Sequence, residues 1–212
     1  MKKMYDDATC EIETYLIENG MIDDLLYWKD INKRVLYIDS DITVTSALEV
    51  IKHILRYNQE DDANNLQPCD RKPIRIFLST YGGEIDAGFG LIDVIVNSAT
   101  PVYTINLSCC YSMGFLIGLA GHKRYGMPNS KFLLHDGSSF VYNSSEKVQD
   151  YMDFSKSVDK KIKDYVLNRT KISSKAYNAN KRKEWYMLAE EAKEKLVIHY
   201  IIGEDTPLSE IL

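Results

Sequence analysis

The chain has 212 residues, enough to bury one sizeable hydrophobic core, and we expect a single domain with at most a small appendage. Its formal net charge of −5 argues against a nucleic-acid-binding surface. The sequence contains no apolar run of membrane-spanning length, and acidic residues follow Met1-Lys2-Lys3-Met4 at once, which does not fit a signal peptide. We therefore expect a cytoplasmic protein with neither a membrane nor a nucleic-acid partner.

The four cysteines, Cys10, Cys69, Cys109 and Cys110, include no C-x-x-C pair. A bridge between the adjacent Cys109 and Cys110 would close a strained ring, and the histidines near them lack ligand spacing. The pattern favours reduced cysteines with structural roles, and it predicts no metal site.

The predicted elements alternate between strands and helices. Residues 1–33 mix acidic and apolar residues and predict a loosely specified N-terminal arm with a short helix around Asp23–Lys29. The hydrophobic periods then predict strands at 34–42, 73–79 and 101–108, helices at 45–61, 85–99 and from about 112, a turn and a strand within 123–137, a long amphipathic helix at 145–168, a last helix at 188–195 and an apolar tail. Strands that alternate with helices predict an α/β fold with a mostly parallel sheet.

Three features have the chemistry of acyl transfer. The two glycines of Tyr81-Gly82-Gly83 follow an apolar strand, where they let the backbone turn with positive φ and present bare N–H groups. Ser112 lies where a strand gives way to a helix, and the amides of the helix start lie beside its hydroxyl. His135 ends a further apolar strand. Each feature alone has an ordinary structural explanation, but together they supply a nucleophile, a base and amides for an oxyanion.

The same stretches resemble, in order and spacing, the proteolytic subunit of the Clp protease family (ClpP). The family's Ser-Pro-Gly-Gly turn matches residues 80–83, its Ala-Ser-Met-Gly motif matches residues 111–114, and its Pro-Asn-(Ser/Ala) turn matches residues 128–130. The resemblance extends from about residue 34 to residue 208, with its densest stretches at 81–95, 111–135 and 189–192, and it implies a ClpP-like peptidase domain at 34–212. Residues 1–33 match the family poorly, so they are a divergent N-terminal arm, which the resemblance places as an axial segment. The resemblance also implies a ClpP/crotonase-type ββα superhelix with a protruding handle helix at about 145–168.

By this resemblance Ser112 is the nucleophile, His135 is the general base, and the backbone amides of Gly83 and Met113 form the oxyanion hole. The third catalytic position, aligned backwards from Ala189 without a gap, falls on Asn180 where the family has aspartate. The nearest carboxylate is Glu184, four residues along. An asparagine orients an imidazole without stabilising its charge, so the sequence predicts reduced or conditional activity.

Three other positions depart from the family pattern. Tyr81 replaces a proline and Tyr111 a small residue, so both turns carry bulk that could cover the cleft. Leu196 stands where the family turns on glycine after the last helix. The cysteines before Ser112 are interpreted as packing residues rather than nucleophiles.

The resemblance implies a homo-oligomer, a heptamer or tetradecamer, that cleaves unfolded polypeptides or peptides and takes them from a ring unfoldase ATPase of the Clp type. This chain needs no cofactor, because any ATP is used by the unfoldase. Three alternatives stay open from the sequence. Asn180 favours a silent structural subunit beside an active paralogue, and the divergent arm favours a phage-type peptidase that processes a capsid or scaffold protein. A crotonase-like hydratase or isomerase would leave the Ser112–His135 pair without a purpose.

Overall fold

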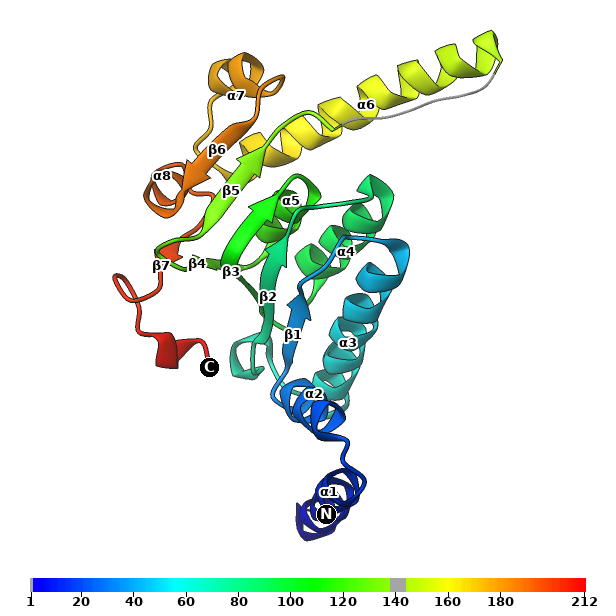
Figure 1. Cartoon of the computed structure of the whole chain (residues 1–212), viewed down its shortest axis with the longest axis vertical. Helices are drawn as coiled ribbons and strands as arrows, with labels where there is room; N and C mark the ends of the chain where they lie inside the picture. The colour runs from blue at the N-terminus through cyan, green and yellow to red at the C-terminus, as the bar shows by residue number, and fades with distance from the viewer. Residues whose placement is uncertain (1, 138–143) are drawn as a thin grey trace.

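Within residues 2–137 and 144–212, which the computed structural model describes, a seven-stranded, mostly parallel sheet forms the centre of the fold (Figure 1). Five strands lie in the order β1-β2-β3-β4-β7, while β5 pairs in parallel with the second half of β3, and β6 pairs antiparallel with β5. The bounds are β1 Val35–Ile38, β2 Ile74–Thr80, β3 Val102–Tyr111, β4 Lys123–Gly126, β5 Lys131–Leu134, β6 Trp185–Leu188 and β7 Tyr200–Ile201. The predicted α/β class with a mostly parallel sheet is confirmed.

Three helices, α3 (Val44–Ala63), α4 (Ile85–Asn97) and α5 (Met113–Ala120), cover one face of this sheet (Figure 1). Their apolar stripes meet the inward residues of the strands, and the side chains of Ile54, Leu91 and Ile117 are fully buried. Burial of this apolar surface is the main stabilising contribution to the fold. The opposite face is lined by aromatic rings, with Tyr37 stacked on Phe77 at 5.4 Å between ring centroids.

Several predicted bounds need correction. Strand β3 continues beyond Ser108 to Tyr111, so both neighbouring cysteines lie in the strand. Residues 123–137 hold two strands, β4 and β5, rather than one, because a turn at 127–130 lets each strand pair with a different half of β3. Helix α7 (Ser174–Asn180) and strand β6 were not predicted, and the apolar tail contains β7.

Two helices form the N-terminal part, α1 (Lys2–Glu18) and α2 (Ile22–Asn32), the second containing the predicted short helix. Leu25 and Ile31 of α2 are buried, and the Tyr57 hydroxyl of α3 donates to the Ile31 carbonyl at 2.6 Å. Helix α2 is therefore packed on the body of the fold. Among the described residues, no helix is long and apolar enough to cross a membrane.

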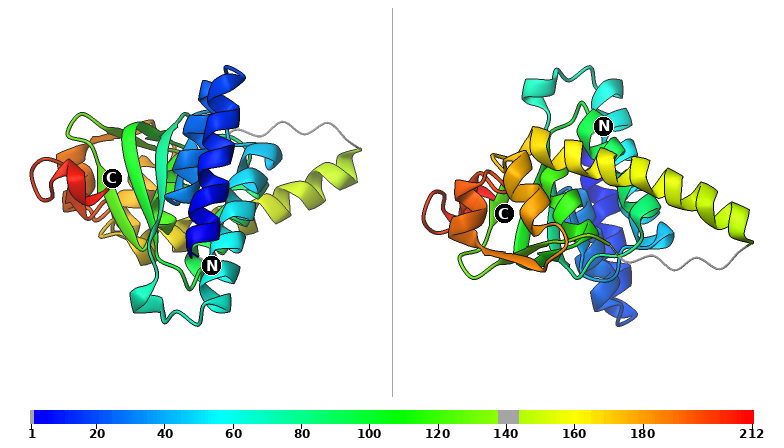
Figure 2. Two further views of the ribbon diagram at one scale, coloured as in Figure 1. Left: turned by 90° about the horizontal axis from the view of Figure 1, so that it is seen from below. Right: turned by 90° about the horizontal axis from the view of Figure 1, so that it is seen from above.

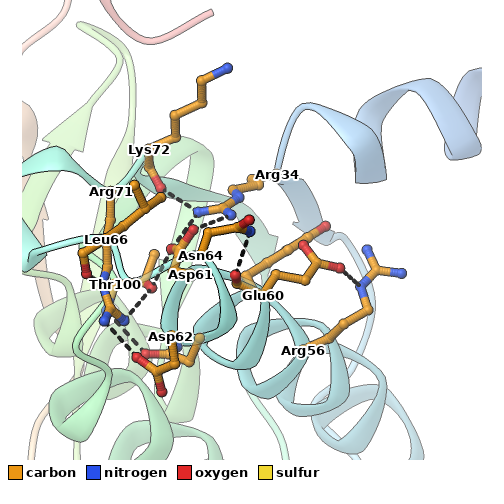
Figure 3. Close-up of polar contacts among 12 residues, drawn as sticks. Arg34, Arg56, Glu60, Asp61, Asp62, Asn64, Leu66, Arg71, Lys72 and Thr100 are labelled. Atoms are coloured by element: carbon orange, nitrogen blue, oxygen red, sulfur yellow. Dashed lines mark hydrogen bonds and ion pairs between the residues drawn. The ribbon is translucent and has the colours of Figure 1, made fainter. Parts of the chain in front are cut away.

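A polar network joins the end of α3 to the starts of β1 and β3 (Figure 3). Asp61, 1% exposed, accepts two hydrogen bonds from the Arg34 guanidinium, at 2.7 and 2.6 Å, and one from the Thr100 hydroxyl at 2.7 Å. The Arg34 hydrogen bonds are the main reason why the pKa of Asp61 is lowered. Pairing this carboxylate with Arg34 offsets the cost of burying its charge.

Helix α6 (Ser145–Arg169) extends away from the body, as Figure 2 shows, and it is one residue longer than the predicted handle. Its C-terminal end is anchored on α5: Arg169 donates to the Leu119 and Ala120 carbonyls, and the Tyr165 hydroxyl donates to the Leu116 carbonyl. Farther out, Met152 is 48% exposed and Phe154 is 64% exposed. The distal part of α6 thus presents apolar side chains to solvent in the single chain.

Candidate active site

The site is built where strands of the sheet end side by side. Parallel pairing sets Thr80 of β2 opposite Cys110 of β3, and Tyr111 of β3 opposite Leu133 of β5. The carboxyl ends of parallel strands meet at one edge of a sheet, which is where such folds place ligands. The glycine turn after β2, Ser112 after β3 and His135 after β5 therefore converge at this edge.

Ser112 occupies a sharp strand-to-helix turn with a strained backbone. Its φ of 54° and ψ of −120° lie outside the regions that non-glycine residues prefer. The Ser112 amide donates to the Leu133 carbonyl at 3.0 Å, which extends the β3–β5 ladder by one residue, and α5 begins at the next position. The side chain makes no capping hydrogen bond, so the Ser112 hydroxyl is not engaged in closing the helix. Strained backbone conformations of this kind occur often at functional sites.

The glycine turn lies directly against Ser112. Gly82 has φ of 107°, and a Cβ added there would lie 2.8 Å from the Ser112 Cβ and 2.8 Å from the Tyr111 carbonyl oxygen. Gly83 has φ of 151°, and its added Cβ would lie 2.2 Å from the Ile42 carbonyl oxygen. Ile42 and the turn are further joined by hydrogen bonds from the Ile42 amide to Gly82 and from the Glu84 amide to Ile42. Only glycine fits at either position, because any side chain would collide with backbone.

The backbone amides of Gly83, in the turn, and of Met113, the first residue of α5, have no acceptor among the described residues. The first N–H groups of a helix lack intrahelical partners, and they carry the positive end of the helix dipole. Both amides are therefore available to an oxygen that gains negative charge.

His135 is held through one nitrogen of its ring and has the other unengaged. Its Nδ1 lies 3.0 Å from Glu184 Oε1. Its Nε2 is buried and has no hydrogen-bond partner among the described residues. A buried, unpartnered nitrogen on a half-buried ring is unusual outside functional sites. A direct hydrogen bond between Ser112 and His135 is thus not formed in this structure.

Asn180, the residue predicted to orient His135, makes a different contact. Its Nδ2 donates to the Ala176 carbonyl, one turn back in α7, at 2.9 Å. Among the described residues no hydrogen bond joins Asn180 to His135, and Glu184 makes the contact instead. Sequence reasoning noted Glu184 as the nearest carboxylate but placed the third position on Asn180, because a gapless alignment ignores how α7 leads into β6.

The cysteines next to Ser112 differ in exposure but are both in β3. Cys110 is 1% exposed, and burial raises the pKa of its thiol well above the ordinary value. Its Sγ is 3.4 Å from the Gly114 carbonyl oxygen. A thiol so buried and so weakly acidic is a poor nucleophile.

Three tyrosine rings line the site next to Ser112. Tyr111 packs edge-to-face between Tyr81, at 5.6 Å, and Tyr186, at 5.8 Å between ring centroids. Tyr111 and Tyr186 also line a groove of about 680 Å³ whose other walls come from Lys131, β6 and α8 (Ala189–Glu194). The bulk predicted at residues 81 and 111 therefore forms, together with Tyr186, one aromatic cluster beside the turn that carries Ser112.

The family model for Clp protease matches residues 20–205, and the chain therefore belongs to this family. The ClpP/crotonase-type fold expected from the sequence is accordingly confirmed. The chain is 26% identical over 174 residues to the ATP-dependent Clp protease proteolytic subunit 2 of Treponema denticola, covering 81% of this chain and 83% of the relative. It is 24% identical over 179 residues to the proteolytic subunit 1 of Bacillus cereus, covering 84% and 89% respectively.

Proposed function

We propose that this chain is a serine endopeptidase that cleaves unfolded polypeptides or peptides through an acyl-enzyme. The single observation that carries the proposal is that a strained Ser112 at a strand-to-helix turn lies at the same sheet edge as His135, whose buried Nε2 has no hydrogen-bond partner among the described residues. Membership of the Clp protease family supports the same reaction.

In the first half of the proposed reaction the Ser112 hydroxyl attacks the substrate carbonyl carbon while His135 Nε2 takes its proton. The carbonyl oxygen becomes an oxyanion, and the free amides of Gly83 and Met113 stabilise the new charge. Loss of one such donor typically costs 10²- to 10³-fold in rate. The C–N bond then breaks, the imidazolium gives its proton to the leaving amine, and an acyl-Ser112 ester remains.

In the second half water replaces the amine. His135 Nε2 takes a proton from the water, the hydroxide adds to the ester carbonyl, and the same two amides hold the oxyanion. Collapse of this intermediate breaks the bond to Ser112 Oγ, which recovers the proton from the imidazolium. The products are a carboxylic acid and the free hydroxyl.

We also propose that the chain works as a ring oligomer, a heptamer or a stacked pair of heptamers, with a Clp-type ATPase as a partner. The exposed Tyr151 and Phe154, three residues apart and so on one side of the projecting α6, support a protein contact there, because contiguous exposed apolar surface marks interfaces. Sedimentation velocity at micromolar concentration should give a species many times larger than the single chain. A 24.4 kDa monomer would contradict this part of the proposal.

A fluorophosphonate probe followed by peptide mapping tests the chemistry directly. We expect modification on Ser112 in the wild type and none in Ser112→Ala, while Cys109→Ala keeps the labelling. Peptide hydrolysis should follow the same order. Because the hydroxyl makes no capping hydrogen bond, Ser112→Ala should remain folded.

One observation favours a second candidate, a catalytically silent ring subunit that pairs with an active paralogue. The hydrogen bond between Ser112 and His135 is not formed in the single chain. If the wild-type ring is intact yet Ser112 is neither labelled nor able to hydrolyse a peptide, the silent subunit is the better account. Catalytic hydrogen bonds often tighten only when substrate binds, so we place the peptidase first.

A further inference from the structure

Glu184 contacts His135, the proposed general base, directly. Asn180, to which alignment with the family assigns the orientation of that histidine, does not. We propose that Glu184 is the positioning residue for His135, replacing the family's aspartate, and that Asn180 has no part in the reaction. The effect of Glu184 on catalysis rests on the proposed function, but its contact with His135 can be tested without measuring activity.

The register of the sheet places Glu184 beside His135. Strands β5 and β6 are antiparallel, with Leu134 opposite Trp185. The next pair outward is therefore His135 and Glu184, and side chains directly opposite one another on antiparallel strands lie within contact distance. The 3.0 Å distance from His135 Nδ1 to Glu184 Oε1 is the result.

The segment before β6 is also bound to the residue that follows His135. The Lys183 amide donates to the Asn180 carbonyl at 2.8 Å, which closes a turn at the end of α7. The Asp136 amide donates to the Lys181 carbonyl at 2.6 Å, and the Lys181 ammonium lies 3.8 Å from the Asp136 carboxylate. The turn that contains Asn180 is thus tied to the residue after His135, while the chain leads on to Glu184.

The chemistry of the contact suits a serine nucleophile. A carboxylate at Nδ1 accepts a hydrogen bond from Nδ1–H, so the neutral ring presents its unprotonated Nε2 to the serine hydroxyl. The same carboxylate stabilises the imidazolium once it forms. The second oxygen, Oε2, is 3.4 Å from the Tyr186 hydroxyl, which connects the carboxylate to the tyrosine cluster.

The exposure of the carboxylate limits the size of its effect. The Glu184 side chain is 55% exposed and that of His135 is 25% exposed, so water screens the pair. Replacing a buried triad aspartate by asparagine lowers kcat about 10⁴-fold. For Glu184→Gln we expect a smaller loss, roughly 10- to 10³-fold in amide hydrolysis, because the charge that is removed is partly screened.

The kinetic test compares Glu184→Gln with Asn180→Ala as a matched control. Glu184→Gln should lower kcat for peptide amides far more than for activated esters, whose leaving group needs no proton. Glu184→Asp should keep part of the activity, and Asn180→Ala should stay within about twofold of the wild type.

A second measurement does not depend on activity. Histidine labelled with ¹⁵N in the ring lets NMR report which nitrogen of the neutral His135 imidazole carries the proton, with its signals assigned from His135→Gln. We expect the proton on Nδ1 in the wild type and in Asn180→Ala, and a loss of that preference in Glu184→Gln, whose amide group can also face the ring. The other charged pair beside the ring, Asp136 with Lys181, is the same in both variants.

Either measurement can overturn the inference. A Glu184→Gln variant with the wild-type tautomer and the wild-type amide rate, beside an impaired Asn180→Ala, would return the role to Asn180. If instead the wild type is inactive and unlabelled, the proposed function fails, and the NMR measurement of the tautomer still decides whether Glu184 holds the ring.

Discussion

Replacing Ser112 by glycine should stabilise the protein while it removes the proposed nucleophile. Ser112 has φ of 54°, in the region where the Cβ of an L-residue is crowded against its own backbone. A residue held in such a conformation costs of order 1–3 kcal/mol, and the surrounding structure must impose it. Glycine has no Cβ and adopts this φ freely. The strain should therefore be measurable as stability gained on its release.

The magnitude follows from comparing Ser112→Gly with Ser112→Ala, because both variants lack the hydroxyl. Alanine keeps the backbone strain of about 1–3 kcal/mol. Glycine relieves that strain but makes the unfolded chain more flexible, which costs about 0.4–1 kcal/mol. The net expectation is that Ser112→Gly is more stable than Ser112→Ala by roughly 1 kcal/mol.

Urea unfolding followed by far-UV circular dichroism measures this difference, at one protein concentration and with equal m-values. Ser108 provides the control, since it is an exposed residue of β3 whose φ is not positive. There the order should reverse, and Ser108→Gly should be less stable than Ser108→Ala by about 0.5–1 kcal/mol. A Ser112→Gly variant no more stable than Ser112→Ala, with the Ser108 pair in its expected order, would refute the backbone strain at Ser112.

Three further predictions concern other positions. Leu196 follows α8 with φ of 54°, a conformation that glycine adopts more easily than other residues. In urea titrations the free energy of unfolding of Leu196→Gly should therefore exceed that of Leu196→Ala by about 1 kcal/mol, and the reverse order would contradict this prediction. Burial, and then the charge of Arg124, lowers the pKa of His199 to about 4. Because this pKa lies below the unfolded value near 6.5, the free energy of unfolding is at its full value above pH 6.5 and falls by at most about 3 kcal/mol as the pH is lowered towards 4. His199→Gln should flatten this part of the curve of stability against pH, and an unchanged curve would show that His199 is not its source. Tyr111→Ala should accelerate labelling of Ser112 by a bulky fluorophosphonate more than by a small one, since its ring packs between two other tyrosines at the site; equal acceleration would mean that the ring does not limit access.

Most of the site could be predicted from sequence because each part of it is local. The glycine turn, Ser112 and His135 each follow an apolar strand within one or two residues, and the ends of parallel strands meet at one edge whatever the loops between them. The long periodic helices were predictable for a similar reason: the apolar stripe of α6 extends over many turns. Short elements were missed, because β6 has only four residues and α7 only seven, too few for a period to stand out.

The partner of His135 depended on tertiary structure. Counting back from Ala189 assumes that the chain has no insertion or deletion relative to the family before that residue, and on that assumption the third position falls on Asn180. In the structure Asn180 ends α7 and bonds back to its own helix, while antiparallel pairing of β6 with β5 sets Glu184 opposite His135. Sequence by itself determined the family, the strand-end motifs and hence the residues proposed as nucleophile and base. Only the tertiary structure decided which polar side chain reaches the imidazole, because a strand register, which sequence spacing does not encode, sets that distance.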